Sequence, residues 1–588
     1  WGKGLENIGT KNEVYMSDGL KINVTTGELG GNTTTLVGVT NQGKLTLGEN
    51  TKINVLINTK EVGSSSTAYG AELKYSSSTY FGKGSEINVS NSTGIAVGIS
   101  VDSTGFSNKS NVFIGDDVKI RAEVREAKSE IKNGHWALGI YQLLGDTITI
   151  GNGLILETEI TLSSGVSGQS YAVYNMANGK INIGNNAAIS AKGTNASSVM
   201  GLNNNSGKMN IGKNSQISAE GTDASKVYTV CNDGLSSEVT IKDGGTITAI
   251  GENIVFIMGL YNNNGGKMNI GNGVKIISIL NSEKEKDNVY GVYNTKDSKL
   301  NIGDGVKIFS TINSKEQKNY AYSVYNKGDS ILNIGKNSEI SVEGKDANQI
   351  RAVHNDGSSS EVTIEDGSII TAIGENTSFV IGVSNKTGSI KLNGGTSIYS
   401  DGYAVYNDNG NVSITDEGYN KKIQGLIFST KAGSITDILL DTEDSYLEGR
   451  SVQENGGVFN LGLKNNAAWY IPQDSTVTNF NIENGIVDMA QNYKGETING
   501  KQTLSIDNTT GEGGKYILDI SPEDKDQTGN KTDYIYIKKA DTSQKNYVQA
   551  GKTSISDLVN HNFSDKENSS IMIAASDKNV TFEGSEFS

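Results

Sequence analysis

The chain has 588 residues, of which 66 are acidic and 51 basic, and it combines 72 glycines with only 2 prolines. This length exceeds that of a domain with a single compact core, so it predicts several domains or a repeat array. The net charge of −15 disfavours nucleic acid and anionic membranes as partners, because both need a stripe of Lys and Arg. Basic clusters such as Lys421-Lys422 are too short to reverse this balance. The single cysteine, Cys231, rules out an intrachain disulfide and a four-thiolate zinc site.

A short strand ending in an Ile-Gly-like step recurs along the chain. Its last apolar residue, here called the anchor, returns every 22 to 36 residues. The anchors are Leu47, Phe81, Ile114, Ile150, Ile183, Ile211, Ile241, Ile270, Ile302, Ile334, Ile364, Leu392 and Ile414. Apolar and polar residues alternate around them, which is typical of strands buried on one face. Tyr290 to Ile312, for example, contains YGVYN, KLNIG and VKIFSTI.

Three strand-like pieces per repeat predict an all-β fold. We expect a right-handed parallel β-helix (β-solenoid) with three short strands per coil of about 30 residues. A longer repeat supports this prediction, since Asn210–Asn253 and Asn333–Asn376 are identical at 31 of 44 positions, with an offset of 123 residues. Such self-similarity indicates an internal duplication within a repeat architecture.

An asparagine stands six to nine residues before successive anchors. These asparagines are Asn41, Asn175, Asn204, Asn232, Asn262, Asn294, Asn326, Asn355, Asn385 and Asn407. Asparagine tolerates the left-handed backbone of a sharp corner, and stacked amides can hydrogen-bond along the axis. We therefore expect a structural asparagine ladder rather than a binding site.

A second column lies directly before the asparagines. It contains Tyr141, Tyr174, Tyr261, Tyr293, Tyr325 and Tyr406, whereas other coils place Thr40, Ser100, Asn203, Cys231, His354 or Ser384 there. The apolar residue before each of them should face the core, so this column should face outward. Exposed tyrosines are good contact residues for a ligand. They also form simple stacking pairs across coils, and both interpretations remain open.

Polar insertions are expected at one corner of the coils, after the third strand of a unit. The insertions are Asn58 to Thr67, Glu126 to Gly134, Ser163 to Gln169, Asn281 to Asn288 and Ser314 to Asn319. They differ from coil to coil, whereas the strands barely change. Variable loops on a rigid scaffold suit recognition. Insertions into ordinary solvent-exposed loops also cost little free energy, so the loops need not bind anything.

The sequence contains no catalytic motif, and we expect neither an enzyme nor a cofactor. The three histidines, His135, His354 and His561, are widely separated. His354 aligns with Cys231 between the two long repeats, so both are interpreted as tolerated surface variants. A run with Asp524, Asp526, Thr528 and Gly529 resembles the start of an EF-hand loop. However, Ile535 stands where a bidentate glutamate is required, so no metal site is expected.

After about Gly425 the pattern changes. Val458 to Met489 reads VFNLGLKNNAAWYIPQDSTVTNFNIENGIVDM, and TLSIDNTTGEGGKYILDI and TDYIYIKKA follow within Thr503 to Ala540. This succession resembles the pertactin-like C-terminal part of passenger domains of monomeric (type Va) autotransporters. The matching positions are Trp469, Ser475, Val477, Phe480, Asn484-Gly485, Leu504, Gly513-Gly514 and Asp533-Tyr534. Trp469 and Tyr516 are expected to be core or cap residues.

The resemblance implies export through an outer-membrane barrel, with this segment acting as a folding seed. The chain would then comprise a repetitive β-helix (1–425), C-terminal coils with an autochaperone region (426–540) and a tail leading to a missing barrel (541–588). We see no signal peptide, and the longest apolar run, Ile254 to Met258, is too short to span a bilayer. A mature or trimmed fragment is therefore expected, without direct membrane insertion.

The expected function is adhesion at a bacterial cell surface, with the passenger either tethered to the outer membrane or released. The ligand would be a host-cell or matrix protein or glycan, held by the loops or by an outward face of the β-helix. The first alternative is self-association with the same protein on a neighbouring cell, which leads to aggregation or biofilm. A secreted glycan-acting enzyme is the second alternative. It requires a groove with two carboxylates within reach of each other.

Overall fold

The computed structural model describes residues 2–26, 33–58, 65–104, 109–127, 134–521, 531–540, 543–552, 554–555, 573–576 and 579–584. Across these residues the chain is a parallel β-solenoid of about 17 turns with roughly 30 residues per turn. The predicted all-β solenoid is therefore confirmed.

The chain divides into two compact units, which are described separately. Unit 1 comprises Trp1–Gly335, Ser341–Ile350 and Glu375–Ser378. Unit 2 comprises Lys336–Ile340, Arg351–Gly374 and Phe379–Ser588. The three-part division with borders at 425 and 540 stays a prediction.

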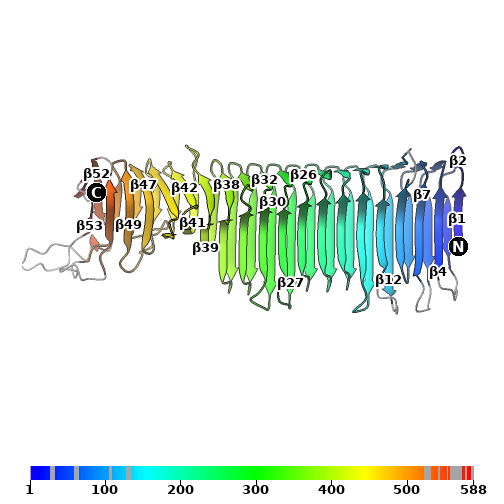
Figure 1. Ribbon diagram of the computed structural model, residues 1–588, viewed down its shortest axis with the longest axis horizontal. Helices are drawn as coiled ribbons and strands as arrows, with labels where there is room; N and C mark the ends of the chain where they lie inside the picture. The colour runs from blue at the N-terminus through cyan, green and yellow to red at the C-terminus, as the bar shows by residue number, and fades with distance from the viewer. Residues whose placement is uncertain are drawn as a thin grey trace, which may run out of the picture. The chain divides into compact units, whose positions relative to one another are not determined.

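Each coil of unit 1 contains three strands. In one coil they are β28 (Asn288–Asn294), β29 (Lys299–Ile302) and β30 (Lys307–Ser314), which correspond to the three predicted pieces. Each strand pairs in parallel with its counterpart one coil away. For example, β29 pairs with β26 (Lys267–Ile270), and β30 pairs with β27 (Lys275–Ser282). The strands of unit 1 accordingly stand side by side in Figure 1.

The anchors form an aliphatic column inside the solenoid. Ile302 lies opposite Ile270 in the β26–β29 pair, and both side chains are buried. None of the thirteen anchors is more than 4% exposed. Because a strand side chain alternates between two faces, the polar neighbours of each anchor point to the solvent side. The period-two pattern therefore predicted this interior correctly.

The insertions of unit 1 lie at one corner, between a strand such as β30 and the first strand of the next coil. Asn281 to Asn288 connects β27 with β28, and Ser314 to Asn319 connects β30 with β31 (Tyr320–Lys327). Ser163 to Gln169 connects β15 (Ile155–Leu162) with β16 (Gly168–Met176) at the equivalent corner. The insertions near residues 58–67 and 126–134 lie largely outside the described residues.

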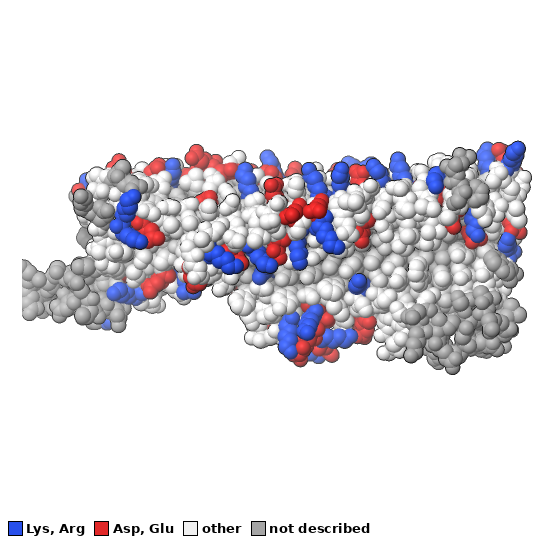
Figure 2. Space-filling view, in the orientation of Figure 1, with Lys and Arg blue, Asp and Glu red and all other residues white. Residues whose placement is uncertain are grey.

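Ion pairs join two of these corner loops. Lys315 pairs with Glu283 and Lys318 with Glu285, so oppositely charged residues of successive coils meet. Figure 2 shows basic and acidic side chains gathered together at the lower edge, below the region that carries β27 in Figure 1. Exposed ion pairs of this kind contribute little to stability, because water and salt screen the attraction. The mixture of charges also leaves no continuous basic stripe on this edge.

The coils of unit 2 become shorter from Ile398 to Val487 and longer again after Val487. Ile398 of β39 (Ser397–Asn407) lies opposite Ile423 of β41 (Lys422–Thr430). Ile423 in turn lies opposite Leu447 of β43 (Tyr446–Glu448), and Leu447 opposite Trp469 of β46 (Ala468–Tyr470). The strands that continue the anchor column become longer instead. These are β42 (Ile435–Leu440), β45 (Val458–Lys464), β47 (Ser475–Glu483) and β49 (Thr503–Thr510).

Large aromatic side chains fill the interior of unit 2. Trp469 is fully buried, and its ring centroid lies 6.4 Å from that of Phe459 and 6.1 Å from that of Phe480. Its indole Nε1 donates a hydrogen bond of 2.9 Å to the carbonyl oxygen of Gly449. Tyr516 is also fully buried. The prediction that Trp469 and Tyr516 are core residues is confirmed.

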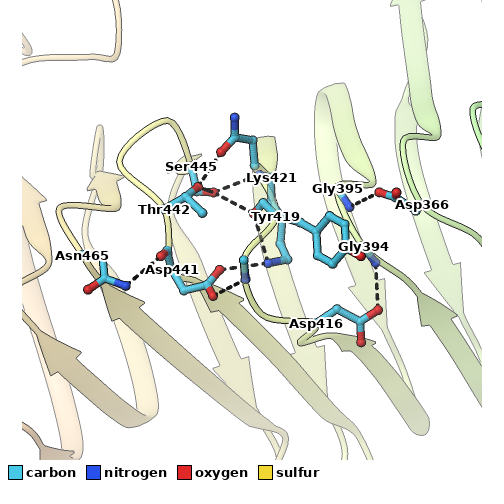
Figure 3. A network of polar contacts seen from close by, with 12 residues as sticks. Asp366, Gly394, Gly395, Asp416, Tyr419, Lys421, Asp441, Thr442, Ser445 and Asn465 are labelled. Atoms are coloured by element: carbon cyan, nitrogen blue, oxygen red, sulfur yellow. Dashed lines mark hydrogen bonds and ion pairs between the residues drawn. The ribbon is translucent and has the colours of Figure 1, made fainter.

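A polar network holds the corner before β41 (Figure 3). Lys421 is fully buried, and its Nζ lies 3.3 Å from Oδ1 of Asp441 and 3.3 Å from the carbonyl oxygen of Tyr419. Oδ2 of Asp441 accepts a hydrogen bond from the backbone N–H of Gly418. The view of Lys421 as part of a basic cluster is therefore wrong for this residue, because internal partners occupy its ammonium group.

Candidate functional site

The predicted asparagine column forms an amide ladder inside the solenoid. In unit 1, Nδ2 of each asparagine donates to Oδ1 of the next at 2.8 to 2.9 Å, from Asn175 through Asn204, Asn232, Asn262 and Asn294 to Asn326. In unit 2, Asn355 donates to Asn385 at 3.1 Å, and Asn385 to Asn407 at 3.4 Å. All of these side chains are fully buried, so they stabilise the stacking and are closed to a ligand.

The left-handed backbone lies at other residues than those predicted. The ladder asparagines have ordinary extended strand conformations, and the positive φ angles belong to residues of the turns. Examples are Asn178 (φ 65°), Asn186 (φ 57°) and Asn214 (φ 55°). The physical reason is that a ladder amide must point inward from a strand, whereas a corner needs a residue that can reverse the chain.

The tyrosine column lies on a ladder of strands that bend in their middle. In unit 1 these bent strands include β13 (His135–Gln142), β16, β19 (Ser198–Asn205), β22 (Lys226–Asp233), β25 (Phe256–Asn263), β28 and β31. Tyr290 and Tyr293 of β28 are three residues apart, yet their ring centroids are only 5.0 Å from each other. Side chains three apart on a flat strand point to opposite faces, so the strand bends between them.

The bend brings the backbones of neighbouring coils close together at one position. A Cβ atom on Gly291 would lie 2.7 Å from the carbonyl oxygen of Ser323, which is closer than a side chain can approach. The equivalent positions of the other bent strands are Gly139, Ala172, Gly201, Thr229, Gly259 and Ser323. Glycine is favoured there because the backbone of the next coil comes so near.

The bend brings two columns of side chains together on the outside of unit 1. The upstream column, before the bend, contains Leu138, Tyr171, Met200, Tyr228, Met258, Tyr290 and Tyr322. The downstream column, after the bend, contains Tyr141, Tyr174, Asn203, Cys231, Tyr261, Tyr293 and Tyr325. Together these residues are called the aromatic face.

The predicted tyrosines are half-buried in this face. Tyr141 contacts Tyr174 at a centroid distance of 5.6 Å, Tyr261 contacts Tyr293 at 5.7 Å, and Tyr293 contacts Tyr325 at 5.0 Å. Stacking across coils is therefore present, and part of each ring remains accessible. The sixth residue, Tyr406, lies in unit 2, where its ring stacks on Phe428 at 5.3 Å. Whether these tyrosines bind a ligand stays a prediction.

The upstream column was missed in the sequence. Three of its four tyrosines are almost covered, with Tyr171 6% and Tyr228 and Tyr290 each 8% exposed, whereas Tyr322 is half-buried. Strict alternation placed them on the opposite face from the downstream column. The signal that could have found them is a repeated pattern of tyrosine, a small residue, valine and tyrosine, which reads YAVY at Tyr171, YGVY at Tyr290 and YSVY at Tyr322.

Cys231 and His354 are buried, so their interpretation as surface variants is wrong. Cys231 is 5% exposed within the downstream column. Burial raises the pKa of its thiol to about 12, which keeps it protonated and a poor nucleophile. In unit 2, His354 is 3% exposed, and its Nδ1 lies 3.1 Å from the hydroxyl of Ser384. Neighbouring side chains cover both residues, which the single-strand pattern did not reveal.

A hollow of about 430 Å³ interrupts the aromatic face. It lies where Asn203 and Cys231 replace the tyrosines of the downstream column, between Tyr174 and Tyr261. Burial raises the pKa of Tyr171 to about 12 and also raises that of Tyr174 and Tyr261. The phenols around the hollow are therefore uncharged at neutral pH.

Unit 2 contains a more polar cavity of about 570 Å³. Asp401, Glu448, Arg450, Tyr493 and Lys494 contribute to its lining. The ring of Tyr493 stacks on a neighbouring tyrosine of β43, with centroids 4.9 Å apart. Two carboxylates thus line one cavity, which is the first part of the condition set for the glycan-acting alternative; the second part is that they lie within reach of each other.

Both carboxylates of this cavity also hold the coils together. Oδ2 of Asp401 accepts a hydrogen bond of 3.0 Å from the backbone N–H of Gly374. Oε2 of Glu448 accepts one of 2.9 Å from Nε2 of Gln424. Burial raises the pKa of Glu448, as a general acid would need. The structural contacts account equally for the presence of these residues.

A third cavity, of about 620 Å³, lies over the outer face of the strands β42, β45, β47 and β49. An exposed row of side chains crosses it, in which Asn508 donates to Asn479, Asn479 to Asn460, and Asn460 to Asp437. These hydrogen bonds measure 2.5 to 3.0 Å. The row offers three amide groups and one carboxylate for polar contacts.

Two buried carboxyl groups of unit 2 belong to its interior. Asp533 is fully buried and accepts hydrogen bonds of 2.7 Å from the backbone N–H groups of Gln502 and Asp519. Burial nevertheless raises its pKa to about 7, and it raises the pKa of Asp488 to about 6. Both groups are enclosed by protein, so their titration affects stability rather than a ligand.

In the part of the chain that the structure describes, no group of three or more His, Cys, Asp or Glu could hold a metal ion. The run with Asp524, Asp526, Thr528 and Gly529, and also His561, lies outside the described residues. Within the same described ranges, no helix has the length and apolar character needed to cross a bilayer.

The comparisons with known proteins do not assign a family. No protein-family model matches the sequence. A search of curated proteins likewise finds no match. The resemblance of Val458 to Ala540 to autotransporter passengers therefore stays a prediction.

Proposed function

We propose that this chain is the passenger of an autotransporter, displayed at a bacterial cell surface or released from it, and that it acts as an adhesin. The aromatic face of unit 1 is the surface that binds a host-cell or matrix receptor. The observation that carries this proposal is the run of contacting, half-exposed tyrosines on that face. The motif succession from Val458 to Ala540 supports the passenger assignment.

The aromatic face has the physical properties of a contact surface. Tyrosine combines a large apolar ring with a polar hydroxyl, and it loses little conformational entropy on binding. The strands below it pair on both sides with neighbouring coils, so the rings are held before a ligand arrives. Binding therefore requires little reorganisation of the protein.

The test is binding of the purified chain to a panel of host cells and matrix proteins. The double variant Tyr261→Ala/Tyr293→Ala should weaken binding at least tenfold, because tyrosine is enriched among the few interface residues that carry most of the binding energy. Tyr80→Ala is the matched control, since Tyr80 is 44% exposed on β8 (Ser78–Phe81), outside the aromatic face. Wild-type affinity in the double variant would exclude this face as the binding site.

Self-association is the first alternative function. The exposed row from Asp437 to Asn508 in unit 2 favours it, because repeated amides can hydrogen-bond to a second copy. Analytical ultracentrifugation separates the two functions. Concentration-dependent dimers without host binding would replace the adhesin proposal by aggregation of neighbouring cells.

The glycan-acting enzyme is the second alternative, favoured by the cavity that Asp401 and Glu448 share. Glycoside hydrolysis needs an acid and a second carboxylate on either side of the bond. Release of reducing sugars from polysaccharides by the wild type, abolished in Asp401→Asn/Glu448→Gln, would establish it. Equal background release by both proteins would remove it.

A further inference from the structure

The aromatic face lacks rings in two consecutive coils. In the parallel register of the bent strands, Tyr174 lies opposite Asn203, Asn203 opposite Cys231, and Cys231 opposite Tyr261. The two short side chains leave the hollow of about 430 Å³ described above. Successive coils are spaced by about 4.8 Å, so two missing rings open roughly 10 Å along the face. This length fits one ring together with its substituents.

Tyr171 lines one side of the hollow, and Tyr228 and Tyr261 line the other. Tyr171 and Tyr174 meet edge to face at a centroid distance of 5.3 Å on one side, and Tyr228 and Tyr261 meet at 5.3 Å on the other. Met200 lies between them and is 8% exposed. Part of the lining is therefore aromatic, and such rings can pack against the C–H groups of a saturated ring.

The rim of the hollow is polar and carries no net charge. Gln169, Asn203 and Asn205 place amide groups there. Lys226 and Asp233, the first and last residues of β22, contribute one positive and one negative charge. Amides can both donate to and accept from hydroxyl groups. The balanced charge disfavours a strongly acidic or basic ligand.

The floor of the hollow offers no free strand edge. β19 pairs with β16 on one side and with β22 on the other, and β22 pairs in turn with β25. An extended peptide cannot add to this sheet as a further strand, because the backbone groups are already used within it. The ligand must be recognised by side chains alone.

We propose that this hollow binds one pyranose ring of a neutral glycan, and that the adjoining sugars of the glycan lie along the aromatic face. Ring faces of tyrosine pack against the sugar's C–H groups, and the rim amides hydrogen-bond to its hydroxyls. This inference rests on the proposed adhesin function and names the chemical class of its receptor.

The first test uses isothermal titration calorimetry of the full chain with neutral hexasaccharides of glucose, of galactose and of N-acetylglucosamine, and with hexagalacturonate as the acidic counterpart. Saturable binding of at least one neutral hexasaccharide, with at least tenfold weaker binding of the acidic one, is expected. Failure of every neutral hexasaccharide to titrate, or stronger binding of hexagalacturonate, would overturn the inference.

The second test fills the hollow without disturbing the fold. Asn203→Tyr and Cys231→Tyr each add the residue that the same column carries in neighbouring coils, so the solenoid should accept them. Both variants should weaken saccharide binding at least tenfold. Asn203→Ser keeps the short side chain, and its affinity should remain within threefold of the wild type. Wild-type affinity in Asn203→Tyr would show that the sugar binds elsewhere and would overturn the proposal.

A third measurement separates this inference from the proposed adhesin function. Binding to host cells is measured after the cells are treated with periodate, which destroys sugar rings, or with protease. Loss of binding after periodate supports the glycan inference. Binding that survives periodate but disappears after protease overturns the glycan inference and leaves the adhesin function intact. Absence of binding to untreated cells removes the adhesin function itself.

Discussion

The two units differ in what fills the interior of the solenoid, which is mainly aliphatic side chains in unit 1 and several large aromatic rings in unit 2. In unit 1 the run of tyrosines, including Tyr290 and Tyr293, lies on the outside of an aliphatic interior. In unit 2, Trp469, Phe459 and Phe480 lie inside and contact one another across coils. A repeating coil must fit against near-copies of itself, which favours side chains of similar size. Coils of unequal length leave larger and more specific spaces, which rings can fill.

The difference predicts two modes of stabilisation. The stability of a regular repeat is approximately the sum of the interfaces between neighbouring coils, so damage to one coil spreads mainly to its neighbours. The interior of unit 2 instead depends on a few large contacts that are not repeated. We therefore expect substitutions at a few particular residues to account for most of the stability of unit 2.

The largest effect is expected from a charge in the regular interior. Ile302→Asp places a carboxylate at a position that is 4% exposed and faces Ile270 in the next coil. An unpaired buried charge should cost more than about 4 kcal/mol. Hydrogen exchange should show loss of protection in the coils around β29, and thermal unfolding should begin at a lower temperature. Ile302→Val, expected to cost about 1 kcal/mol, is the control.

An Ile302→Asp variant with wild-type thermal unfolding would contradict the register of the anchor column. A uniform loss of protection through all of unit 1 would instead contradict the expected local response.

The next effect concerns the aromatic interior of unit 2. Trp469→Ala removes the ring between Phe459 and Phe480 and the hydrogen bond to Gly449, at a cost of about 3 to 5 kcal/mol. Hydrogen exchange should increase in β45, β46 and β47 together. Trp469→Phe keeps an aromatic ring and should cost less. A response confined to β46 would contradict the idea of a concentrated core.

A smaller effect is expected from pH, and only in unit 2. The folded pKa of Asp533 is about 7, above its ordinary value of 3.8, so the folded state binds the proton more tightly than the unfolded state. The resulting stability is complete below about pH 4 and is lost as the pH rises through about 7. We expect unit 2 to be less stable at pH 8 than at pH 5, by on the order of 3 kcal/mol. Asp488 acts in the same direction, since its pKa is raised to about 6.

Chemical denaturation at several pH values measures this dependence. Asp533→Asn should flatten the slope between pH 5 and pH 8, even if it lowers stability at every pH because an amide cannot accept both backbone hydrogen bonds. A slope unchanged by the substitution would assign the dependence to another group.

The smallest effect is expected for Cys231→Ser. The side chains are similar in size and the thiol is protonated, so stability should change by less than about 1 kcal/mol. Binding should stay within about twofold of the wild type, because the hollow needs only a short side chain there. Denaturation and the host-cell assay check both expectations. A large loss of binding would revive a thiol-dependent mechanism.

The sequence was most informative about the interior. Alternating apolar residues around anchors such as Ile302 predicted three strands per coil, because burial on one face of a strand imposes a period of two. The three corner insertions within the described residues were located correctly for a related reason, since polar runs that vary in length fit only where the backbone leaves the sheet. Trp469 and Tyr516 were also predicted as core residues, through the resemblance rather than through periodicity.

The site was harder to predict from the sequence, because it depends on contacts between coils. The bend at Gly291 turns Tyr290 to the same face as Tyr293. Strict alternation along a strand assigns these two residues to opposite faces, so it cannot predict the bend. The burial of Cys231 depends on tyrosines of other coils, such as Tyr261. Lys421 was likewise missed, because its partner Asp441 belongs to the following coil. Side chains that are distant in sequence decide each of these cases.

The long internal repeat has a consequence for how such a molecule can evolve. The copied segment carries Ile211 to the position of Ile334, four anchors further along. A duplication of whole turns keeps every column in phase, so the chain can lengthen without a new fold. The copied positions are then free to diverge, as Cys231 and His354 have done. Binding specificity can thus change through the exchange of one side chain per turn on a constant scaffold. The amide ladder meanwhile preserves the register between the coils.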